Sequence, residues 1–100
     1  METIESNDNK WFDLSDKLED ITLTVGKTYI IQPKKNPINC FQGETEPTKP
    51  NDGLSVHPPY QSLKLTHKTG ESIFIRDEHF PSTVNYITIV EVDDGSDDEE

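Results

Sequence analysis

Cysteine and histidine side chains, which bind metals and serve as nucleophile and base, occur at Cys40, His57, His67 and His79. Zinc sites usually take ligands in close pairs about two to five residues apart, and no two of these four residues are that close. Catalysis by Cys40 would need a base held beside the thiol, and the proline-rich surroundings of Cys40 are a poor rigid platform. We therefore expect no metal, no cofactor and a buried or idle thiol.

Other catalytic patterns are equally weak. Gly26-Lys27-Thr28 lacks the earlier glycine of a phosphate-binding loop. Paired carboxylates could work as acid and base only in a pocket, whereas most acids lie in the predicted helix or tail described below. The sequence predicts a protein that is not an enzyme.

The acidic residues gather at the two ends of the chain. There are 20 Asp and Glu against 9 Lys and Arg, for a net charge of −11. Residues 21–92 sum to zero, so the excess lies in residues 1–20 and 93–100. Such charge repels phosphate backbones and anionic lipids and attracts basic proteins. The tail supplies six acids as candidate partner-binding residues: Asp93, Asp94, Asp97, Asp98, Glu99 and Glu100.

The tail allows several interpretations. It could compete with nucleic acid for a basic groove, chelate a divalent cation, or carry a kinase site at Ser96. The simpler alternative is a disordered end that keeps the protein soluble. Calcium binding is disfavoured, because Asp93-Asp94-Gly95 lacks the alternating ligands of a calcium loop.

Aromatic residues beside acids are the other candidate anchors for a basic partner. Trp11 and Phe12 stand next to Asp13 and Asp16, and Phe41 lies in a proline-rich segment. Trp11 could instead close one end of the fold, and Phe41 could simply pack onto the body. These alternatives stay open at the level of sequence.

The elements that must position these residues follow from hydrophobic spacing. Trp11, Leu14, Leu18 and Ile21 step by three or four and predict a helix over about residues 7–20, capped from Asn7-Asp8-Asn9. Residues 1–6 are expected to fray. Period-two alternation then predicts a strand, a turn and a strand over residues 21–31, a hairpin over 62–75, and a long strand over 84–92.

Residues 33–60 differ from both flanks, because they hold six of the seven prolines. We expect one long loop here, functional or disordered. The whole predicts one small domain over residues 1–92 and a disordered acidic tail over 93–100. With few strands and tight turns, a mainly β barrel of five or six short antiparallel strands is expected.

One resemblance supports the barrel. The runs LTVGKTYII (residues 23–31), LKL (63–65) and TGESIFI (69–75) resemble the small SH3-like barrel proteins common in phages. The resemblance covers about half the chain and implies a shape, since that family shares no single activity. Residues 33–60, the predicted helix and the acidic tail depart from it.

Together these features predict a non-enzymatic, phage-type interaction protein that binds a basic host protein and inhibits or redirects it. The lone cysteine and the absence of an apolar leader favour a cytoplasmic location, and no run is apolar enough for a membrane. Direct nucleic-acid binding is disfavoured. One alternative is a nucleic-acid-binding barrel with an autoregulatory tail, in which bases would stack on Tyr29, Tyr60, Phe74 or Tyr86. A virion accessory protein is another, and the sequence leaves the oligomeric state open.

Overall fold

The computed structural model describes residues 1–6, 10–49, 52–78 and 84–92. Eight strands and one short helix lie within them, which confirms the prediction of a mainly β protein. In chain order the elements are β1 (Glu2–Ser6), β2 (Phe12–Asp13), α1 (Leu14–Lys17), β3 (Thr28–Pro33), β4 (Ile38–Gly43), β5 (Leu54–Val56), β6 (Leu63–Thr66), β7 (Ser72–Asp77) and β8 (Asn85–Val92).

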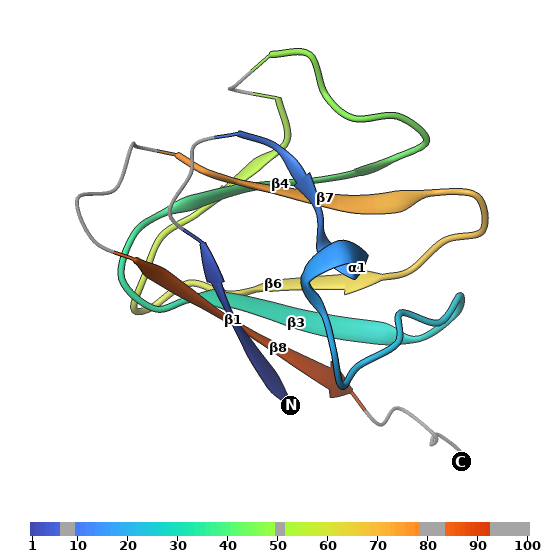
Figure 1. The fold of residues 1–100 in the computed structure, drawn as a ribbon, viewed down its shortest axis with the longest axis horizontal. Coiled ribbons are helices and arrows are strands. Elements are labelled where there is room, and N and C mark those ends of the chain that lie inside the picture. The colour runs from blue at the N-terminus through green and yellow to red at the C-terminus, as the bar shows by residue number, and fades with distance from the viewer. Residues whose placement is uncertain (7–9, 50–51, 79–83, 93–100) are drawn as a thin grey trace.

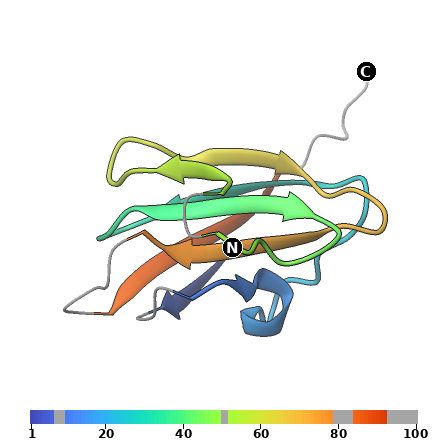
Figure 2. The same ribbon diagram turned by 90° about the horizontal axis from the view of Figure 1, so that it is seen from above.

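The described strands form two four-stranded antiparallel sheets (Figure 1). One has the order β1-β8-β3-β6 and the other the order β2-β7-β4-β5. This is the connectivity of an eight-stranded jelly roll. The expected closed barrel is therefore wrong for the part of the chain that the structure describes. Edge-on, β1, β2 and α1 lie on one side of the molecule and β5 and β6 on the other (Figure 2).

Alternating side chains of the central strands fill the space between the sheets. Each central strand gives two apolar side chains to this core, which explains the period-two pattern of its sequence. The buried residues are Tyr29 and Ile31 of β3, Ile38 and Cys40 of β4, Ile73 and Ile75 of β7, and Ile87 and Ile89 of β8. β8 confirms the long strand expected over residues 84–92.

The helix predicted over residues 7–20 is mostly absent. Residues 12–13 pair with β7 as a strand, and the helix covers only Leu14–Lys17 before Leu18 becomes extended. Leu14 is fully buried, while Phe12, Leu18 and Ile21 each pack against the core from extended backbone. The spacing of these apolar residues by three or four therefore reflects their separate contacts with the core and not one face of a long helix. The expected caps at residues 7–9 lie outside the described residues.

The long loop predicted over residues 33–60 is also wrong, because it contains β4 and β5. Ile38, Cys40 and Val56 are buried in the core. β4 lies in the middle of its sheet between β7 and β5. The prolines outside β3 interrupt only the segments before, between and after these two strands.

Three further expectations change. Residues 2–6 form β1 and do not fray, since Ile4 and Ser6 face the interior. Residues 21–25 form no strand, because backbone N–H groups of this segment bond to side chains. The hairpin over 62–75 is not formed either. Its strands β6 and β7 pair with β3 and β4 in different sheets, so the connection at 67–71 crosses between the sheets.

Candidate functional site

The fold pairs the first strand of the chain with the strand that precedes the acidic tail in the sequence. β1 pairs antiparallel with β8, so that Glu2 lies beside Ile89 (Figure 1). The described chain ends three residues later at Val92, and the six tail acids follow directly in the sequence. At about 3.3 Å per strand residue, Val92 lies about 10 Å along β8 from the level of Glu2. The tail residues themselves lie outside the described part of the chain.

The Glu2 carboxylate fixes the segment after the helix. It accepts hydrogen bonds from the backbone N–H groups of Glu19 at 2.7 Å and of Asp20 and Ile21 at 3.0 Å. The bond from Glu19, with those from Ile21 and Asp20, lowers the pKa of Glu2 below its ordinary value of 4.5. Because these backbone groups bind the carboxylate, the side chains of Glu19 and Asp20 stay exposed beside it.

Further carboxylates complete what we call the acidic end. Asp13, Glu19 and Glu71 line one pocket there, and Glu5 and Asp20 line another with Glu2 and Glu19. Asp16 of α1 and Glu91 of β8 belong to the same end. Lys27 forms an ion pair with Glu91 at 2.9 Å. Both side chains are well exposed, so the pair contributes at most about 1 kcal/mol and is weakened by salt. Lys17 and Lys68 are the other lysines nearby in the sequence. Carboxylates therefore outnumber ammonium groups at this end even without the tail.

A pocket of about 350 Å³ opens at the acidic end between residues 13–23 and the 67–72 connection. Its apolar lining comes from Leu18, Ile21 and Leu23, which are half-buried and pack against the core. Its acidic lining comes from Asp13, Glu19 and Glu71. The pocket thus combines an apolar floor with a negative rim.

The predicted partner-binding residues near the N-terminus divide into two groups. Asp16 is exposed at the acidic end, as a contact residue should be. Asp13 lines the pocket, but its carboxylate also caps α1 by accepting from the N–H and hydroxyl of Ser15 at 3.0 and 2.9 Å. Phe12 packs against the core, with the Lys17 ammonium 5.1 Å from its ring centre. Phe12 is thus a structural residue.

The other two predicted aromatic anchors lie away from the acidic end. Trp11 is half-buried, and its indole N–H donates to the Lys49 carbonyl at 3.2 Å, which ties the β4–β5 connection to the chain before β2. Phe41 is half-buried beside Phe74 on the neighbouring strand. The structure therefore assigns both aromatics contacts of their own within the fold.

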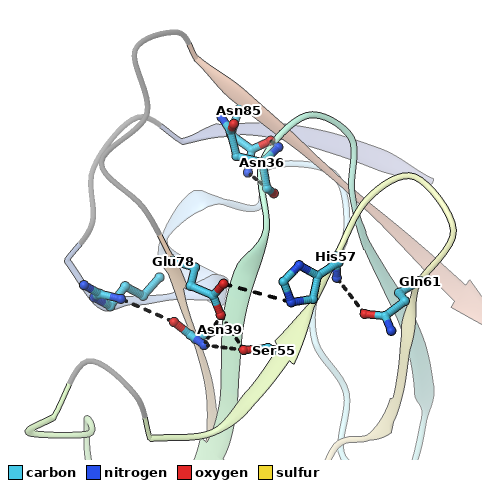
Figure 3. Close-up of polar contacts among 8 residues, drawn as sticks. Asn36, Asn39, Ser55, His57, Gln61, Glu78 and Asn85 are labelled. Atoms are coloured by element: carbon cyan, nitrogen blue, oxygen red, sulfur yellow. Dashed lines mark hydrogen bonds and ion pairs between the residues drawn. The ribbon is translucent and has the colours of Figure 1, made fainter.

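A polar cluster at the opposite end of the second sheet brings together residues of β4, β5 and β7 (Figure 3). One Glu78 carboxylate oxygen accepts from the Ser55 hydroxyl and from the Asn39 amide at 3.2 Å. The other lies 4.0 Å from His57 Nε2. If Ser55 were a nucleophile, its hydroxyl would form a hydrogen bond with the imidazole of a histidine base. The Ser55 hydroxyl instead donates to Glu78. This cluster links strands.

Near this cluster, the buried side chain of Asn85 forms a second set of hydrogen bonds. Its amide oxygen accepts from the backbone N–H groups of Lys35 and Asn36 at 3.1 and 2.9 Å. Its nitrogen donates to Asn36 O at 3.1 Å and to Asp77 Oδ1 at 2.9 Å. Ser6 donates to the other Asp77 oxygen, so the cluster joins β1, β7, β8 and the β3–β4 turn.

The residues considered for metal binding and stacking are scattered. Cys40 is buried, and burial raises the pKa of its thiol to about 12. Within residues 1–6, 10–49, 52–78 and 84–92, no three His, Cys, Asp or Glu side chains group as metal ligands. Tyr29 and Phe74 are buried, which leaves Tyr60 and Tyr86 exposed among the proposed stacking residues. His79 lies outside the described residues.

Comparison with protein families, curated proteins and solved structures finds no match to this chain. In the described residues, no helix has the length and apolar character needed to cross a membrane. The fold and the site define a small two-sheet β protein in which the acidic end borders a pocket with a mixed apolar and acidic lining.

Proposed function

We propose that the protein is a non-enzymatic interaction protein that binds a basic surface of another protein through its acidic end and tail. The observation that carries the proposal is the pairing of β1 with β8, in which Glu2 lies beside Ile89 and also binds the backbone of Glu19 and Asp20. Charges gathered in this way attract a basic partner from a distance and fix its orientation.

The proposed site has two parts, which are the acidic end and the acidic tail. Hydrogen bonds hold the first part in place before a partner binds. The Glu2 hydrogen bonds hold the backbone of residues 19–21, so the exposed carboxylates there need little ordering when a partner binds. The pocket adds apolar area that charge alone would lack. We further propose that the partner is a host protein that this chain inhibits or redirects.

Capture of partners from host lysate tests this function. The full-length protein is immobilised beside two full-length variants: one with the six tail acids changed to their amides, and one carrying Glu19→Gln and Asp20→Asn. A control carries Glu46→Gln, which removes an exposed acid of the β4–β5 connection outside the acidic end. We expect the wild type and control to retain the same partners at low salt and to release them at high salt.

Both acidic-end variants should retain much less of those partners. Equal capture by all four proteins, or capture that salt does not change, would show that the acidic end is not the binding surface. Salt-sensitive capture of single-stranded DNA in the same format would favour the nucleic-acid alternative.

A further inference from the structure

The pocket at the acidic end has an apolar floor and a negatively charged rim. Leu18, Ile21 and Leu23 form the apolar part, and each is only partly covered by the core. Because one flank of each side chain packs inward, the exposed flank is available to an apolar chain. The volume of about 350 Å³ is at the small end of the range of about 300–1,000 Å³ for ligand sites.

The rim of the pocket is negative and comes from separate parts of the chain. Glu19 is the first residue of the segment fixed by Glu2, and Glu71 belongs to the 67–72 connection on the opposite wall. Asp13 adds a third carboxylate from the start of α1. Among the described lining residues there is no lysine or arginine. The charge inside the rim is therefore not neutralised by the lining itself.

We propose that this pocket receives a lysine side chain of the partner. The inference rests on the proposed function and specifies the group that is recognised. The aliphatic stem of lysine lies along Leu18, Ile21 and Leu23, and its ammonium group lies between the carboxylates of Glu19 and Glu71.

Lysine fits this arrangement better than arginine. An ammonium group has three donors that point in different directions, which suits carboxylates on opposite walls. The planar fork of arginine favours two oxygens of a single carboxylate. A norleucine side chain would keep the apolar contact and lose the charged one.

A titration followed by amide resonances of the ¹⁵N-labelled full chain tests the inference. The probes are the capped tripeptides acetyl-Gly-Lys-Gly-amide, its arginine analogue and its norleucine analogue. We expect the lysine peptide to shift the amides of residues 18–23 and 67–72 saturably, with a dissociation constant on the order of 1 mM. The two analogues should bind at least about fivefold more weakly, because each lacks one part of the fit.

The matched variants are Glu71→Gln and Glu19→Gln in the pocket and Glu46→Gln outside it, which all remove one negative charge. The first two should weaken lysine-peptide binding about three- to tenfold, and Glu46→Gln should leave it unchanged. Retention of the wild-type spectrum by each variant shows that the fold is intact.

Unmoved pocket amides, or equal shifts with lysine and norleucine, would overturn the lysine pocket. If lysate partners were still captured through the acidic end, the proposed function would stand without it. If neither the lysine peptide nor the lysate partners bound through the acidic end, the proposed function would be wrong as well.

Discussion

Asn85 is a buried amide whose four hydrogen bonds connect two backbone N–H groups, one carbonyl and the Asp77 carboxylate. Replacement of Asn85 by Ala would leave these buried groups unpaired. Each unsatisfied buried group costs about 1–3 kcal/mol, so we expect Asn85→Ala to lower the free energy of unfolding by at least about 2 kcal/mol. Urea denaturation measures this change.

Gln61 provides the control, because it is an exposed amide whose oxygen accepts from the His57 N–H at 2.8 Å. Gln61→Ala should cost at most about 1 kcal/mol. Equal stabilities for the two variants would contradict the role given to Asn85.

Cys40 illustrates how burial controls reactivity. Since burial raises its pKa to about 12, almost no thiolate exists at neutral pH, and thiolate is the reactive form. We expect the folded protein not to react with an aromatic disulfide reagent at pH 8, and the protein unfolded in urea to react at once. Rapid labelling of the folded protein would show that the β4 interior is open.

At the scale of elements, the β4–β5 hairpin depends on a glycine that approaches another strand. Gly53 has φ of 88°, and a Cβ there would overlap the Cys40 carbonyl. Gly70 has φ of 77° but open space around it. Gly70→Ala should cost about 1 kcal/mol from backbone strain, and Gly53→Ala at least about 2 kcal/mol more. Equal thermal midpoints for these variants would rule out the close approach.

The hydrogen bonds from residues 19–21 to Glu2 make the stability of the N-terminal elements depend on pH. Because the folded-state pKa of Glu2 is lowered by these bonds, its contribution is present above the ordinary value of 4.5 and is lost as the pH falls through the folded value. Glu2→Gln should therefore lower the thermal midpoint at pH 7 and flatten its decline toward pH 3. Glu5→Gln, an exposed neighbour on β1, is the control. Parallel pH profiles of wild type and Glu2→Gln would contradict this assignment.

The sequence predicted an element correctly where the spacing of its buried side chains came from that element alone. β3, β7 and β8 were visible because their inward side chains alternate with period two. β4 and β5 carry the same signal at Ile38, Cys40 and Val56, which the neighbouring prolines obscured. The helix was over-predicted, because contacts of Leu14, Leu18 and Ile21 with the core imitate helical spacing.

At the scale of the whole molecule, the acidic character of both chain ends was evident from sequence, but the pairing of β1 with β8, which brings Glu2 beside Ile89, was not. These strands lie far apart in the sequence, and a single sequence gives no direct signal for such a pairing. The pocket was missed for the same reason, since its walls come from residues 13–23 and 67–72. Asp13 and Asp16 lie at the acidic end, whereas Trp11, Phe12 and Phe41 have partners inside the fold. The role of all five residues in partner binding stays a prediction.

The central claim is that the two acidic ends form one electrostatic binding surface. The affinity for a lysine-rich peptide of about 20 residues, measured from low to high salt, tests it most directly for the full chain and the variants described above. We predict that wild type and the Glu46→Gln control lose at least about tenfold in affinity between roughly 50 and 200 mM salt. Neutralising the tail or Glu19 and Asp20 should weaken binding and reduce that salt dependence. Affinity independent of salt, or unchanged in both acidic-end variants, would contradict the claim.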